Sequence, residues 1–215
     1  MAIIAVIQQK GGVGKSTITA NLAGELLHKK RSVRILDLDP QQSLVTWAGL
    51  GSGILRDVVI PTSVQSVKQF KAAVDKASNE ADWVLLDCPP GLPDAGLMAA
   101  LVTDVALLPV SPAPLDVIES KKVLALIRDA QRQRKGSLPV IGYVPSKVIH
   151  NTILAKDLAN TLRPTKELVL PGITQRTAIA ESVLKGMTLR EYAPRSEGVI
   201  EFETLLKAVE KMVKK

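Results

Sequence analysis

The segment KGGVGKST, from Lys10 to Thr17, combines the residue types that hold phosphate groups. Glycine adopts positive φ at little cost and lets the backbone approach a ligand closely. Lys15 would place a positive charge beside the phosphates, and the Ser16 hydroxyl is a typical Mg²⁺ ligand in such loops. The residues predicted to bind the nucleotide here are Gly11, Gly12, Val13, Gly14, Lys15, Ser16 and Thr17.

The flanking sequence predicts a strand before this segment and a helix after it. Residues 2–8 form a short apolar run typical of a buried strand in a parallel sheet. From Ser16 to Lys30, apolar residues recur at the spacing of one helix face. The N–H groups and the positive dipole end at the start of a helix attract anions, so phosphates bound by the glycine-rich turn would lie at the N-terminus of that helix.

Carboxylates stand at the ends of two further predicted strands. The run from Ser32 to Asp39 carries Asp37 and Asp39, which the alternation of a strand would point to the same side. In the segment Asp82–Gly91, Asp87 closes an apolar run, where it is placed to hold Mg²⁺, in part through water. The ends of parallel strands bind ligands in doubly wound sheets. For the first pair, capping of the following helix is the alternative.

Strand and helix patterns alternate along the rest of the chain, which predicts a doubly wound, mainly parallel α/β sheet with helices on both faces. We expect one domain, residues 1–215, and a loop over Gly49–Arg56. The proline-rich stretch Ser111–Asp116 is expected to be a rigid loop, and the last helix, residues 197–214, to bury one apolar face. The other predicted strands span 58–61, 104–110 and 138–144, and the other helices 64–77, 94–101, 117–135 and 151–162.

The glycine-rich segment departs from the usual P-loop pattern, because Gln9 stands at the first glycine position and a second lysine, Lys10, follows it. In this form it resembles the deviant Walker A box of the ParA/MinD family of dimerising ATPases. DLDPQQS and DCPPG resemble the family's two switch segments and follow in the family's order. Because we expect no N-terminal helix-turn-helix domain, the chain looks most similar to short plasmid-partition ParA proteins. The C-terminal region matches the family pattern at Glu181, Gly186, Tyr192, Pro194 and Ser196.

The resemblance implies roles for the site residues. It implies an ATPase that uses ATP, ADP and Mg²⁺ and works as an ATP-dependent sandwich homodimer, with Lys10 reaching phosphate across the dimer. Lys15 would neutralise the negative charge that develops on the phosphates, and Asp39 would orient the attacking water. Asp37 would have a supporting place near Mg²⁺ and Lys15. Ser16 and Asp87 would hold the metal, and the residues beside the adenine ring would be Ser146, Lys147 and Pro171.

The positive charge is concentrated in the C-terminal part. Residues 121–215 hold 18 basic and 9 acidic residues, whereas residues 1–120 hold 10 basic and 12 acidic ones. Such a surface suits the DNA backbone, although a merely solvated surface is the alternative. By resemblance, the residues that would contact nonspecific DNA are Arg176, Lys185, Arg190 and Arg195, but Ala178, Ile179 and Ala180 stand where many relatives have a further arginine.

A second basic feature lies on the predicted helix 117–135. Lys121, Arg128, Arg132 and Lys135 fall on one side of it. This stripe is either a DNA-facing surface or a solvated outer face.

We therefore expect a cytoplasmic, nucleoid-associated partition ATPase stimulated by a ParB-like centromere-binding partner. The lack of a signal-peptide pattern and of any apolar run near about 18 residues argues against a membrane segment. The single cysteine, Cys88, excludes a four-cysteine site within one chain. The alternatives are positioning of another cargo, such as chemoreceptor clusters or carboxysomes, and a MinD-like ATPase with an amphipathic C-terminal helix on the membrane.

Overall fold

In the computed structural model, which describes residues 1–214, seven parallel strands form one sheet in the order β3-β2-β4-β1-β5-β6-β7. The strands are β1 Ala2–Val6, β2 Val33–Asp37, β3 Val59–Pro61, β4 Trp83–Asp87, β5 Val105–Val110, β6 Val140–Pro145 and β7 Leu168–Val169. The predicted doubly wound fold class is confirmed. Since β1, β2 and β4 are neighbours, the glycine-rich loop and the two aspartate segments leave the same edge of the sheet.

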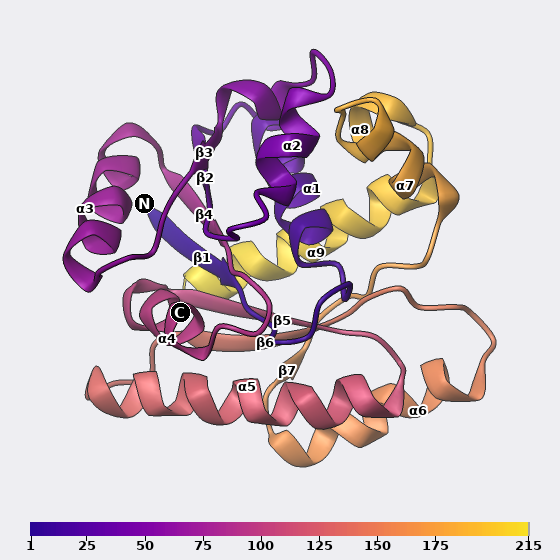
Figure 1. Cartoon of the computed structure of the whole chain (residues 1–215). Coiled ribbons are helices and arrows are strands. Elements are labelled where there is room, and N and C mark those ends of the chain that lie inside the picture. Colours follow the sequence, from indigo (N-terminus) through magenta and orange to yellow (C-terminus); the bar gives the residue numbers. More distant parts are fainter. Residues whose placement is uncertain (215) are drawn as a thin grey trace.

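Helices cover both faces of the sheet (Figure 1). They are α1 Lys15–His28, α2 Ser43–Gly49, α3 Val67–Glu80, α4 Pro93–Val102, α5 Pro114–Gln133, α6 Ile153–Leu162, α7 Thr177–Leu184, α8 Leu189–Tyr192 and α9 Glu197–Val213, with 3₁₀ turns η1 Ile54–Asp57 and η2 Arg163–Thr165. One apolar core joins the sheet to α1, α2, α8 and α9, and a second joins its other face to α3, α4, α5 and α6. The alternation of side chains along the buried strands feeds both cores.

Three local predictions need correction. β2 ends at Asp37, so strand alternation does not extend to Asp39. The expected loop Gly49–Arg56 contains most of η1 and begins at the last residue of a short helix, α2, for which the sequence predicted no bounds. The proline-rich stretch is only half loop, because Pro114 begins α5, and proline is well tolerated in a first helical turn.

The last helix packs as predicted. Phe202, Leu205, Leu206 and Val209 of α9 are fully buried in the core that contains α1. Ser196 caps the helix by accepting a hydrogen bond from the N–H of Gly198. The apolar face of α9 is therefore covered by the sheet and by α1.

Candidate nucleotide site

The glycine-rich loop has the backbone shape that its sequence predicts. Gly12 and Gly14 have φ values of 74° and 93°, in the left-handed region that glycine occupies without a steric penalty. Gly14 is the residue before α1, so the loop runs directly into the N-terminus of that helix. The first N–H groups of α1 and its dipole are thus available to an anion at this loop.

Lys15 and Ser16 turn inward toward Asp87. Lys15 is 7% exposed, and its Nζ donates to the Lys10 carbonyl at 3.2 Å. The Ser16 hydroxyl donates to Asp87 Oδ2 at 2.6 Å, and Thr19 Oγ1 lies 3.4 Å from Oδ1 of the same carboxylate. Asp87 thus ends β4 directly against the first turn of α1.

Burial and neighbouring charges shift the pKa values of Asp87 and Lys15. Burial raises the pKa of Asp87 to about 7, with Asp37 and Asp39 also raising it, while the Ser16 hydrogen bond and Lys15 lower it. Burial lowers the pKa of Lys15, against the opposing effect of Asp87. A hydroxyl and a carboxylate side by side are hard oxygen donors, so Ser16 and Asp87 fit Mg²⁺ held together with phosphate oxygens.

Asp37 and Asp39 differ in their surroundings. Asp37 is buried and accepts hydrogen bonds from the N–H groups of Asp39, Leu44 and Val45, so it caps α2 and orders the segment that follows β2. The helix-capping alternative therefore holds for Asp37. Asp39 is only half-buried, and it lines a cavity of about 490 Å³ between this segment and the start of α4.

Lys10 lies at the surface beside the loop. Its side chain is 41% exposed and forms an ion pair with the buried carboxylate of Asp116 in the first turn of α5. Ser111 also donates to Asp116, at 2.5 Å. Sequence reasoning did not predict this ion pair, because the two residues are 106 positions apart.

A cavity of about 690 Å³ opens beside Gly14 and Thr17. Its polar lining includes Ser146 and Lys147, two of the three residues expected beside the adenine ring, and the Ser146 hydroxyl donates to the Val13 carbonyl at 2.6 Å. Pro171 does not line this cavity, whereas further residues for which no adenine contact was predicted do. These are Ile18, Ile149, Ile173, Thr174, Gln175, Arg176, Thr177, Ile179, Ala180 and Val183. A wall that combines aliphatic side chains with polar groups suits a nucleobase.

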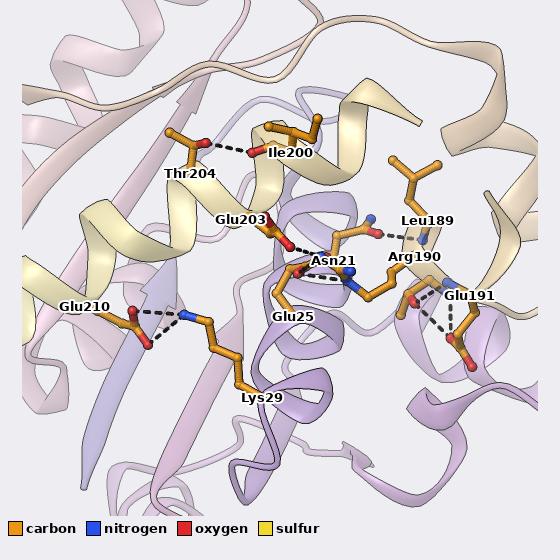
Figure 2. Close-up of polar contacts among 11 residues, drawn as sticks. Asn21, Glu25, Lys29, Leu189, Arg190, Glu191, Ile200, Glu203, Thr204 and Glu210 are labelled. Carbon is orange, nitrogen blue, oxygen red and sulfur yellow. Dashed lines mark hydrogen bonds and ion pairs between the residues drawn. The ribbon is translucent and has the colours of Figure 1, made fainter. Parts of the chain in front are cut away.

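The four basic residues predicted to contact DNA fall into two groups. Lys185 and Arg195 are exposed, and within residues 1–214 neither has an ion-pair partner. Arg176 is 22% exposed and pairs with Glu197 and Glu201 at 3.0 and 2.8 Å. Arg190 is 18% exposed and is held by Glu25 and Glu203, as Figure 2 shows. Lys185 and Arg195 are therefore the two that remain available to a phosphate backbone.

Arg190 instead ties α8 to α1 and α9. Its guanidinium donates three hydrogen bonds to Glu25, at 2.9, 3.0 and 2.6 Å, and Glu25 is only 3% exposed. Next to it, the N–H of Leu189 donates to Asn21 Oδ1 at 2.8 Å (Figure 2). We expect this cluster to stabilise the fold.

Arg190→Ala should lower the free energy of unfolding by about 3–5 kcal/mol, because it leaves the Glu25 carboxylate buried without its partner. The measurement is urea denaturation followed by circular dichroism. Lys185→Ala removes an exposed charge from the same region and should stay within about 0.5 kcal/mol of the wild type. An Arg190→Ala protein as stable as the Lys185→Ala control would contradict the structural role.

Comparison with known proteins gives a consistent result. Residues 4–189 match the model of the CobQ/CobB/MinD/ParA nucleotide binding domain. The ParA protein of Rhizobium radiobacter is 30% identical over 83% of this chain and 80% of its own length. The maintenance of carboxysome distribution protein A of Halothiobacillus neapolitanus is 34% identical, over 60% of this chain and only 59% of its own length.

The fold has a close counterpart among solved structures. The septum site-determining protein MinD of Pyrococcus horikoshii OT3, in complex with Mg-ADP, superposes with a TM-score of 0.77. The alignment covers 98% of this chain and 96% of that protein, at 23% identity.

Proposed function

Because the chain belongs to the CobQ/CobB/MinD/ParA nucleotide-binding domain family, we propose that it is a ParA-type partition ATPase that binds DNA in its ATP-bound state. It binds ATP and ADP with Mg²⁺ and hydrolyses ATP. The observation that carries this proposal is the convergence of Lys10, Lys15, Asp39 and Asp87 at the edge where β1, β2 and β4 end.

The residues divide the chemistry among them. Backbone N–H groups of residues 11–16 cradle the phosphates, and Lys15 neutralises the charge that develops on them. Ser16 and Asp87 would hold Mg²⁺, which would supply positive charge beside the phosphates. Asp39 orients the attacking water, and Asp37 fixes the backbone of the segment that carries Asp39 by capping α2.

The base and the second subunit complete the site. The cavity formed by Ser146, Lys147 and the apolar residues of α7 takes the adenine ring. Lys10 acts on the nucleotide of the partner protomer in a sandwich homodimer, for which it must leave Asp116. Hydrolysis then depends on dimer formation.

The C-terminal surface binds the DNA. Lys185 and Arg195 contact the DNA backbone without regard to sequence, and a ParB-like partner stimulates hydrolysis and release. The protein would associate with the nucleoid in the cytoplasm. ATP-bound dimers on DNA would in this way segregate or space plasmid or chromosome copies.

A second candidate is the positioning of carboxysomes, which the 34% identity to a carboxysome-distribution protein favours. It uses the same ATPase and differs in the partner protein. Co-purification of the chain with shell-associated proteins, rather than with a centromere-binding protein, would identify this cargo.

A MinD-like membrane role receives less support from the fold. The apolar face of α9 that includes Phe202, Leu205 and Val209 is buried against α1 and the sheet, and Ile200 is an exposed large apolar residue of this helix. Among residues 1–214, no helix combines the length and apolar character required to cross a bilayer.

Binding to random-sequence duplex DNA, measured with ATP and with ADP across a salt series, tests the proposal. We expect ATP to tighten binding at least about tenfold, and log K to fall steeply with log salt because phosphate contacts release counterions. ATP with a magnesium chelator is the control and should behave like ADP. Equal DNA binding in all nucleotide states would contradict the proposed switch.

A further inference from the structure

The outer face of α5 carries a row of exposed, positively charged side chains. Lys121, Arg128 and Arg132 are offset by 7 and 11 residues, which places them within about 40° of one another around the helix. All three are exposed, Arg132 at 73% and Arg128 at 45%. Lys135 follows just past the helix end and is also exposed. The opposite side of α5, including Val123, is buried in the second core.

These cations line open hollows in the protein surface. Two adjoining hollows of about 410 and 480 Å³ share Arg128 and Arg132 and run from Lys121 to Lys135. Thr165 of η2 forms the other wall, and its carbonyl accepts a hydrogen bond from Arg128 at 2.9 Å. We call this feature the basic groove: Lys121, Arg128, Arg132 and Lys135 with the adjacent turn η2.

Nearby carboxylates do not balance the basic groove. Arg128 pairs with Glu167 at 2.9 Å, and Arg132 pairs with Asp129 one turn away. Within the part of the chain that the structure describes, Lys121 and Lys135 have no ion-pair partner. Two further exposed cations flank Pro164 and Thr165 in the sequence: Arg163, the first residue of η2, and Lys166, which follows its end. These positive charges repel one another in the free protein, and binding of a polyanion would relieve this repulsion.

The dimensions favour the backbone of duplex DNA. From Lys121 to Arg132 the helix advances about 16 Å, a length over which one DNA strand carries about five phosphates. A row of cations over this length can contact several phosphates of such an array, whereas a single small anion would need only one or two of them.

We propose that the basic groove is a second DNA-binding surface, separate from the C-terminal residues Lys185 and Arg195. This inference rests on the proposed function, because it takes the same ligand. α5 lies on the face of the sheet opposite to α1 and α9, along the outer edge of the molecule in Figure 1. With DNA contacts on both faces, one protomer can hold two duplexes and bridge them.

The test compares Lys121→Glu/Lys135→Glu with Lys68→Glu/Lys71→Glu, which makes the same change of charge on exposed positions of α3. With ATP and a random-sequence 30-base-pair duplex, the α5 variant should bind roughly tenfold more weakly, and its salt slope should fall by about two. When it is bound to DNA-coated beads, the α5 variant should also fail to retain a second, fluorescent duplex, which is the measure of bridging. The α3 control should keep both properties, and ATP hydrolysis without DNA should be unchanged in the two variants.

Each other outcome has a defined meaning. If the α5 variant matches the α3 control in affinity and bridging, the inference is overturned. The same holds if only Lys185→Glu/Arg195→Glu weakens binding, in which case the proposed function stands. Loss of binding to phosphatidylglycerol vesicles, with DNA binding intact, would also overturn it. If the wild-type protein with ATP does not bind DNA at all, the proposed function itself fails.

Discussion

Lys15→Ala should abolish ATP-dependent DNA binding. The Lys15 ammonium is nearly buried between the glycine-rich loop and Asp87, where burial lowers its pKa and the carboxylates hold its charge. In this low-dielectric setting, a charge contact to phosphate is worth far more than at the surface. Without it, we expect nucleotide affinity to fall roughly a hundredfold, so that the DNA-binding state is no longer reached at millimolar ATP.

The measurement is DNA binding by fluorescence anisotropy with 1 mM ATP, about the upper range of typical enzyme KM values. Lys68→Ala is the matched control, since it also removes one positive charge but from the exposed face of α3. A thermal melt should show that the Lys15→Ala protein is folded. Full ATP-dependent DNA binding by this folded variant would contradict the proposed switch.

The parts of the site that the sequence predicts are those encoded locally. An apolar β-branched run, glycines that must take positive φ, and a following amphipathic pattern specify the strand, loop and helix around Gly12 and Gly14. Asp87 was predictable because it ends a buried strand. Once these strands lie in parallel, the edge of the sheet that binds the ligand is determined.

The parts that it does not predict depend on distant residues. Arg190 looks like an exposed loop residue in the sequence, but Glu25, 165 positions away, decides its burial. Asp37 caps α2, a helix of seven residues that is too short to give a clear periodic signal. The wall of the large cavity combines Ile149 with residues of α7, which only the fold brings together.

These contacts place the two ends of the proposed switch on one helix. α1 begins in the glycine-rich loop, and Asn21 and Glu25 further along it hold Leu189 and Arg190 of α8 (Figure 2). The exposed residues Lys185 and Arg195 flank α8 in the sequence. A continuous path of hydrogen bonds and ion pairs thus joins the glycine-rich loop, through α1, to the segment between the two residues that we propose contact DNA.

Lys10→Ala should keep nucleotide binding and lose hydrolysis. Lys10 is exposed and its ammonium is held by Asp116 rather than by the phosphate loop of its own chain, so its removal should leave ATP affinity within about threefold. If it stabilises transferring phosphate in the partner, hydrolysis should fall roughly a hundredfold or more. The readouts are ATP affinity by a fluorescent analogue and steady-state release of phosphate.

Mixing variants tests whether Lys10 acts across the dimer. Lys10→Ala and Asp39→Ala should each be inactive, but in a mixed dimer the site that retains Asp39 receives the partner's Lys10. An equal mixture should then recover about a quarter of the wild-type sites, because half of the dimers are mixed and each has one complete site. Asp116→Asn, which frees Lys10 from its ion pair, should retain hydrolysis. Unchanged turnover in Lys10→Ala, or no recovery on mixing, would remove the cross-dimer role and leave Lys10 as the surface partner of Asp116.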